Sequence, residues 1–150
     1  MEVQWTQEHQ RVEDLFRAGR SVFVTGSAGS GKVCLKMPVH VATSRPSVPV
    51  GLQTFLLRHL LGMTAGDKGV HCTALTGMAA QALPEGTTLH KFAGVGLAQG
   101  EAKVLVQTMK YPVQARWRSA RILVIDEVSM LDADLFEKFD QVCSCVLRWG

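Results

Sequence analysis

A glycine-rich stretch near the start of the chain has the residue types and spacing of a phosphate-binding loop. It directly follows a short apolar run, residues 22–24, and consists of Gly26, Ser27, Ala28, Gly29, Ser30, Gly31 and Lys32. Glycines let the backbone curl so that successive N–H groups face the phosphates of a nucleotide, and the lysine can reach the β- and γ-phosphates. We therefore predict that these seven residues bind ATP and that Lys32 is catalytic. The strand-like run before them disfavours the alternative, a glycine-rich turn with an incidental lysine.

A second apolar run ends in two carboxylates. Residues 122–125 are Ile-Leu-Val-Ile, and Asp126 and Glu127 follow them. An aspartate at this place can hold a magnesium ion or its water shell, and a glutamate beside it can polarise an attacking water. We predict that both carboxylates are catalytic, that Asp126 is a metal ligand, and that Mg²⁺ is bound together with ATP. Either residue taken alone could instead be an acidic cap at a helix start.

The phosphate-binding motif departs from its usual pattern just after the lysine. Serine or threonine is expected there because its hydroxyl binds magnesium, but this chain has Val33. Residues 33–53 contain three of the five prolines, no acidic residue and no regular period, so we expect an anomalous inserted loop. Removing this segment would place Thr54 directly after Lys32 and supply the missing metal ligand. We interpret the segment as a retained intron or a gene-model error, with a genuine insertion as the alternative.

The elements that must position these motifs alternate between helix and strand. Thr6 can cap a first helix over about residues 7–18, and Gly19 can end it. Strand-like runs follow at 22–24, 70–74 and 122–125, and further helices are expected at 54–61, 76–83 and 131–142. This alternation predicts an α/β fold, with a parallel sheet covered by helices on both faces and joined by right-handed crossovers.

Composition sets broad limits on the kind of protein. With 150 residues, 47% hydrophobic and 19% charged, the chain is long enough for about one globular domain. No stretch approaches the roughly 20 apolar residues of a membrane span, so no membrane partner is expected. The net charge of +3 is compatible with a polyanionic partner without requiring one. No targeting segment is visible, and the four cysteines lack the spacing of a zinc site.

Three further motifs narrow the class of nucleotide-binding protein. They are Cys72-Thr-Ala-Leu-Thr-Gly-Met-Ala-Ala80, Gly86-Thr-Thr-Leu-His-Lys-Phe-Ala-Gly-Val-Gly96 and Asp126-Glu-Val-Ser-Met130. In order and spacing they closely resemble successive motifs of the Pif (petite integration frequency) family of superfamily-one DNA helicases, over roughly residues 6–32 and 54–142. These motifs disfavour a P-loop ATPase of another kind, which is the competing interpretation.

The resemblance implies a RecA-like P-loop NTPase fold and an ATP-dependent motor that moves five-prime to three-prime along single-stranded DNA. Its expected partners are ATP and single-stranded or forked DNA. Residues 1–150 would then be a partial N-terminal RecA-like domain. The family's Gly-Asp-x-x-Gln-Leu sensor motif and its second RecA-like domain are absent from this sequence. We expect that the 150-residue chain alone does not couple hydrolysis to translocation, and the alternative is a nucleotide- or DNA-binding fragment without turnover.

The resemblance also implies where DNA would lie. Stretches matching Thr73–Ala80 and Gly86–Phe92 line the family's strand-binding groove. Thr76, Thr88 and His90 could hydrogen-bond phosphates, and Phe92 could offer a stacking surface for a base. His90 and Phe92 could equally be core residues.

Two other features follow from comparison with the family pattern. A glutamine near the start of these helicases reads the adenine, and here either His9 or Gln10 can take its place; we choose Gln10. Trp117 lies among three arginines and could form a basic aromatic patch near DNA, although a solvated charged turn is the alternative. By resemblance we expect a monomer in the nucleus, the mitochondrion or both, acting in DNA repair, recombination and telomere maintenance.

Overall fold

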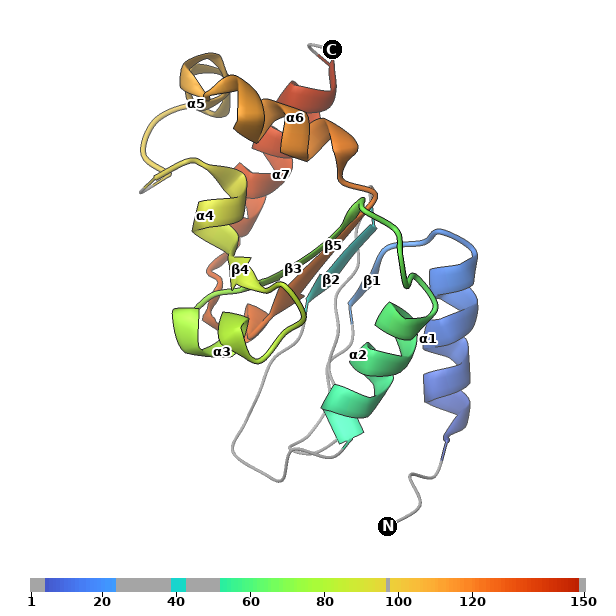
Figure 1. Ribbon diagram of the computed structural model, residues 1–150. Coiled ribbons are helices and arrows are strands. Elements are labelled where there is room, and N and C mark those ends of the chain that lie inside the picture. Colours follow the sequence, from blue (N-terminus) through green and yellow to red (C-terminus); the bar gives the residue numbers. More distant parts are fainter. Residues whose placement is uncertain (1–4, 24–38, 43–51, 97, 149–150) are drawn as a thin grey trace.

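The structure, a computed structural model, describes residues 5–23, 39–42, 52–96 and 98–148, with residues 39–42, 52–55 and 129 described by their backbone alone. A five-stranded sheet forms its centre (Figure 1). The strands are β1 (Val22–Phe23), β2 (Val39–Ala42), β3 (Val70–Ala74), β4 (Thr87–Thr88) and β5 (Ile122–Asp126). Every strand pair is parallel, and the order across the sheet is β1-β2-β5-β3-β4.

Helices cover both faces of this sheet. One face carries α1 (Gln7–Arg17), α2 (Leu52–Gly62) and α3 (Gly77–Gln81). The other face carries α4 (Leu89–Ala93), α5 (Ala102–Thr108), α6 (Tyr111–Ser119) and α7 (Ala133–Arg148). Side chains of β5 alternate between the two cores, since Leu123 and Ile125 join the cluster under α4 to α7 and Val124 joins the cluster under α1 to α3. The predicted α/β fold with a parallel sheet between two helix layers is confirmed.

The first helix begins and ends where its local sequence predicts. The Thr6 hydroxyl accepts the backbone N–H of His9, and the His9 ring accepts the backbone N–H of Thr6, which makes a reciprocal cap. At the other end Ala18 is the cap, and Gly19 has φ +66°, a left-handed conformation that favours glycine.

The proline-rich segment differs from its prediction as a loop. Its residues Val39–Ala42 form β2, which pairs with β1 on one side and with β5 on the other. At its end, Leu52 and Gln53 already belong to α2. The prediction was wrong at these positions because the two neighbouring strands offer hydrogen-bonding partners, and the local sequence does not reveal these partners.

Other boundaries shifted by a few residues. The helix expected at 131–142 begins at Ala133 and continues to Arg148, after a 3₁₀ turn at Val128–Met130 (η1). The helix expected at 76–83 is shortened to α3. Sequence analysis assigned no elements between residues 87 and 119, where the structure has β4, α4, α5 and α6.

Of the three cysteines in the described part of the chain, Cys72 and Cys143 are buried and Cys145 is half-buried, and none of the three forms a disulfide bond. Burial, with a smaller contribution from the charge of Glu85, raises the pKa of Cys72 to about 11. Cys34 lies outside the described residues. None of the described helices has the length and apolar content needed to span a membrane.

Candidate nucleotide-binding edge of the sheet

The predicted motifs meet at one edge of the sheet because all five strands are parallel. The carboxyl ends of parallel strands share one edge, which is where open α/β sheets bind ligands. β1 ends at Phe23, just before the glycine-rich motif, and β5 ends at Asp126. The motif itself, Gly26–Lys32, lies outside the described residues, as does Val33. Its predicted contacts therefore stay predictions, and the topology supplies only the edge from which the motif starts.

Asp126 is a buried carboxylate in the last position of β5. It is 4% exposed and lies opposite Ala74 of β3. Its Oδ1 atom accepts the backbone N–H of Glu127 at 2.8 Å. Next to it, the buried Thr73 hydroxyl donates to the Val124 carbonyl at 2.6 Å and ties β3 to β5. These contacts hold the Asp126 backbone and one of its oxygens in a fixed place at the carboxyl edge.

Glu127 occupies an unusual backbone conformation. Its φ is +60° and its ψ is +34°, which is the left-handed region. For a residue other than glycine this conformation costs about 1–2 kcal/mol, and such strain often marks functional positions. The left-handed residue turns the chain sharply out of β5 into η1, so Asp126 ends the strand and Glu127 forms the turn itself.

The donor set fits magnesium in part. Carboxylate oxygens suit this hard cation, which is often bound by one or two carboxylates together with substrate phosphates. Asp126 meets that requirement, whereas the side chain of Val33 has no donor atom. Within the described ranges no group of three His, Cys, Asp or Glu residues could hold a metal by itself. Thr54, the ligand expected after removal of residues 33–53, is the third residue of α2.

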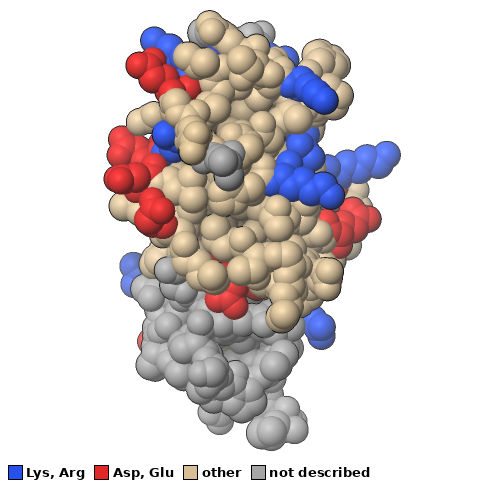
Figure 2. Space-filling view, turned by 90° about the vertical axis from the view of Figure 1, so that its left-hand side faces the viewer, with Lys and Arg blue, Asp and Glu red and all other residues tan. Residues whose placement is uncertain are grey.

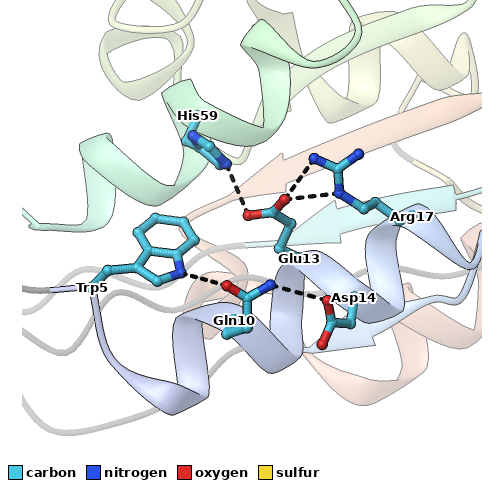
Figure 3. A network of polar contacts seen from close by, with 6 residues as sticks. All are labelled: Trp5, Gln10, Glu13, Asp14, Arg17 and His59. Carbon is cyan, nitrogen blue, oxygen red and sulfur yellow. Dashed lines mark hydrogen bonds and ion pairs between the residues drawn. The ribbon is translucent and has the colours of Figure 1, made fainter.

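The structure separates the two candidates for adenine recognition. His9 is buried and its ring caps α1. Gln10 is exposed on the same helix, where its amide accepts from Trp5 Nε1 at 3.1 Å and donates to Asp14 Oδ1 at 3.0 Å (Figure 3). Because α1 runs antiparallel to β1, its first turn lies toward the carboxyl edge of the sheet (Figure 1). This geometry favours Gln10 over His9.

A second polar network joins α1 to α2 beside Gln10. The Glu13 carboxylate accepts from Arg17 Nε at 2.8 Å and contacts His59 Nε2 at 3.0 Å (Figure 3). The hydrogen bond from Arg17, and after it the one from His59, hold the pKa of Glu13 below its ordinary value against the opposing effect of burial. The Trp5 ring lies edge-on to the His59 ring, with centroids 4.8 Å apart.

Sequence reasoning missed Glu13, Asp14 and His59. The spacing of four residues between Glu13 and Arg17, and between Gln10 and Asp14, was a usable signal for pairs on one helix face. Nothing local indicated the contact between Glu13 and His59, which are 46 residues apart.

Two of the predicted DNA-contacting residues begin short helices. Thr76 follows β3, and its hydroxyl accepts the backbone N–H of Ala79. Thr88 ends β4, and its hydroxyl accepts the backbone N–H of Lys91. Both residues are half-buried and lie near the carboxyl edge. His90 is also half-buried and meets the Phe139 ring edge-on, with centroids 5.7 Å apart.

Phe92 and Trp117 are core residues, which corrects two expectations. Phe92 is 0% exposed and Trp117 is 1% exposed, and their rings pack edge-to-face with centroids 5.0 Å apart. Trp117 Nε1 donates to the Ala93 carbonyl at 3.1 Å, and the guanidinium carbon of Arg116 lies 5.4 Å from the centre of the Phe92 ring. Phe92 therefore offers no stacking surface, and Trp117 forms no exposed basic aromatic patch.

On the flank of the molecule beside α3 and β4, the charged side chains do not by themselves identify a DNA-binding surface. Figure 2 shows a group of Lys and Arg side chains at one border of a face whose described part is largely uncharged. A chain with a net charge of +3 is expected to show such a modest distribution.

The fold and this edge define the class of protein. A parallel sheet with helices on both faces, whose strands lead into a glycine-rich lysine motif and end in an aspartate–glutamate pair, is the architecture of a P-loop NTPase. The family model for "PIF1-like helicase" matches residues 51–149. The chain belongs to the PIF1-like helicase family.

Individual relatives agree with this assignment. The chain is 38% identical over 133 residues to the ATP-dependent DNA helicase PIF1 of Candida albicans. The aligned region covers 87% of this chain and 12% of that protein. It is 36% identical over 144 residues to the human ATP-dependent DNA helicase PIF1, covering 95% and 19% respectively. The crystal structure of the Pif1 helicase from Candida albicans matches with a TM-score of 0.73 at 32% identity, covering 98% of this chain and 30% of that one. The match confirms the predicted RecA-like fold, and the chain spans less than a fifth of each curated relative's length.

Proposed function

We propose that this chain supplies the nucleotide-binding part of an ATP-dependent DNA helicase that moves five-prime to three-prime on single-stranded DNA. One observation carries the proposal. The buried Asp126 ends a strand, and the strained Glu127 follows it, at the carboxyl edge of a parallel sheet from which the glycine-rich motif also starts. The names of the relatives, all ATP-dependent DNA helicases, support the same activity.

In the proposed mechanism each residue has a distinct task. Gly26 to Lys32 bind the phosphates through backbone N–H groups and the lysine ammonium. Asp126 binds the magnesium ion or its water shell, and that ion supplies charge neutralisation at the β- and γ-phosphates. Glu127 accepts the proton of the attacking water as general base. Gln10 reads the adenine edge, after its amide leaves Trp5 and Asp14.

The DNA side of the proposal uses the helix starts beside the same edge. Thr76, Thr88 and His90 would hydrogen-bond strand phosphates, while Phe92 would support them from the core. Serine substitutions at the two threonines keep the helix caps, whereas alanine substitutions remove them. If Thr76→Ala loses DNA binding and Thr76→Ser does not, the stability of the Thr76→Ala variant must be measured as well. The loss indicates a broken DNA contact only if that stability is unchanged.

We further propose that the 150-residue chain by itself shows no DNA-stimulated ATP turnover. It spans 12% to 19% of the curated relatives' length, and Val33 lacks the hydroxyl that the magnesium site requires. The isolated chain would then correspond to the alternative that the sequence left open, a fragment that binds nucleotide or DNA without turnover.

We also propose a monomer that acts in DNA repair, recombination and telomere maintenance in the nucleus or the mitochondrion, supported by the family resemblance.

The direct test measures ATP hydrolysis by the purified chain with and without single-stranded DNA. We expect no stimulation, and a robust increase would overturn the proposal for the isolated chain.

Calorimetry of Mg-ATP binding tests the metal site. It compares the unmodified chain with Val33→Thr and with the double variant Val33→Thr, Asp126→Asn. We expect Val33→Thr to bind at least about tenfold more tightly, a gain of about 1.4 kcal/mol, and Asp126→Asn to cancel that gain. Equal affinities of all three proteins would contradict the assignment of the metal site.

Val33→Thr tests the magnesium site more sharply than a deletion of residues 33–53 would. Deletion would bring Thr54 next to Lys32, but it would also remove β2 from the sheet. Val33→Thr restores the hydroxyl and keeps that strand.

A further inference from the structure

The side-chain amide of Gln10 has a hydrogen-bonding partner at each end. Its oxygen accepts the indole N–H of Trp5 at 3.1 Å, and its nitrogen donates to the Asp14 carboxylate at 3.0 Å. Figure 3 shows the three side chains in a row along α1. Both hydrogen bonds lie at the solvent-exposed surface. A base that approaches from the solvent therefore meets this amide directly.

The two partners of Gln10 present the same hydrogen-bonding groups as an adenine base. Adenine has an amino group that donates and a ring nitrogen that accepts, and a glutamine amide can pair with both at once. The indole N–H of Trp5 can only donate, and the carboxylate of Asp14 can only accept. The amide oxygen is therefore fixed toward Trp5 and the amide nitrogen toward Asp14. Both atoms that would read an adenine already have a partner within the protein.

Trp5 is held in place by the rings of two histidines. Its ring lies edge-on to the His59 ring of α2, with centroids 4.8 Å apart, and tilted against the His9 ring, with centroids 5.4 Å apart. His59 in turn contacts the Glu13 carboxylate of α1 at 3.0 Å. The indole is thus ordered by contacts other than Gln10, so its hydrogen bond to the amide costs little further side-chain entropy.

We propose that Trp5 and Asp14 form an internal mimic of the adenine edge, which the base of ATP must displace from Gln10. In this role they depend on the proposed function of Gln10 as the adenine-reading residue. The mimic competes with a base and not with phosphates, so it lowers the affinity for adenine nucleotides alone. Trp5 and Asp14 are then specificity-determining residues, because they set how much of the adenine interaction contributes to binding.

The first experiment removes one partner of Gln10 at a time. Trp5→Phe keeps an aromatic ring beside His59 but lacks the N–H, and Asp14→Ala lacks the acceptor. Both are made in the Val33→Thr background. Calorimetry measures the dissociation constants of Mg-ATP and of inorganic tripolyphosphate, which has no base. We expect each variant to bind ATP about twofold to tenfold more tightly, the effect of one hydrogen bond, and to bind tripolyphosphate unchanged.

Two controls separate the mimic from general effects of charge and packing. Asp14→Asn keeps an acceptor oxygen and should bind ATP as the Val33→Thr parent does, although it also lacks the charge of Asp14. In a chain that carries Gln10→Ala, Trp5→Phe should no longer change the affinity for ATP. The amide for which the indole and the base compete is then missing, so the two substitutions are not additive.

A second measurement follows the indole N–H of Trp5 directly by NMR. Its signal is the one that disappears in Trp5→Phe. Saturating Mg-ATP should shift this signal toward its position in Gln10→Ala, since both changes break the same hydrogen bond. Tripolyphosphate should leave the signal in place, because it does not compete for the amide.

The results distinguish a failure of the mimic from a failure of the proposed function. If ATP binds no more tightly than tripolyphosphate, or if Gln10→Ala leaves the affinity for ATP unchanged, Gln10 does not read adenine and both assignments are wrong. If Gln10→Ala weakens ATP binding while Trp5→Phe and Asp14→Ala do not strengthen it, the proposed function stands and the mimic is overturned. A Trp5 signal that bound Mg-ATP does not move would also overturn the mimic.

Discussion

Asp126 accepts the backbone N–H of its neighbour Glu127 at 2.8 Å, while Glu127 stands in a left-handed conformation with φ +60°. The hydrogen bond holds the turn that leads out of the sheet, and it uses one oxygen of the proposed metal ligand. The two carboxylates are therefore coupled through the backbone, in addition to their proposed shared role at the nucleotide.

This relationship predicts different stabilities for two substitutions that both remove the Glu127 carboxylate. Glu127→Gly should be more stable than Glu127→Ala by about 1 kcal/mol, because glycine adopts the left-handed conformation without steric cost. Urea unfolding of the two variants measures the difference. If Glu127→Ala is as stable as Glu127→Gly, the left-handed turn is not retained in solution.

Substitutions at His9 and Gln10 should separate helix capping from nucleotide recognition. His9→Ala removes half of the reciprocal cap and should cost about 1 kcal/mol of stability. Gln10→Ala should change stability little, since its side chain is exposed, but should reduce the preference for ATP over GTP. Thermal unfolding and competition binding of the two nucleotides, in the Val33→Thr background, give the two readouts. If His9→Ala loses the preference for ATP over GTP and Gln10→Ala keeps it, the adenine-reading role belongs to His9 and our assignment is wrong.

The Glu13 network predicts part of the pH dependence of stability. The folded-state pKa of Glu13 is lowered, so its contribution is present above the ordinary value of 4.5 and is lost as the pH falls through the folded-state pKa. Glu13→Gln should therefore be less stable than the unmodified chain near neutral pH, and the gap should narrow as the pH is lowered below 4.5. Urea unfolding as a function of pH measures this gap. Glu137→Gln, on the exposed side of α7, is the control, and a gap of constant size would contradict the assigned role of Glu13.

Gly86 should not tolerate a side chain. A Cβ atom added there would collide with the Ala80 carbonyl and approach Leu83 within 2.9 Å. Gly86→Ala should therefore lower the free energy of unfolding by about 2 kcal/mol or more. Gly77→Ala is the matched control, because an added Cβ meets nothing within 4 Å and alanine is a better helix former. Equal stability of the two variants would show that the turn before β4 rearranges freely.

Local patterns in the sequence determined the elements whose causes are local. The cap at Thr6, the left-handed Gly19 and the buried strands β3 and β5 follow from residue type and spacing, and each lies within a residue or so of its prediction. The alternation of these elements was enough to predict a parallel α/β sheet. The carboxyl-edge location of Asp126 follows from that alternation as well, because parallel strands end at a common edge.

The tertiary structure alone decided which residues are buried and which strands are neighbours. Phe92 follows His90 and Lys91 in the sequence and Trp117 stands between two arginines, yet both rings lie in the core, because α4 and α6 pack against each other above the sheet. Val39–Ala42 lacks the sequence context of a strand and becomes an interior one, because β1 and β5 supply hydrogen-bonding partners on both sides. Glu13 meets His59 across 46 residues. Strand pairing and burial depend on partners distant in the chain, and these partners come together only when the whole sheet forms.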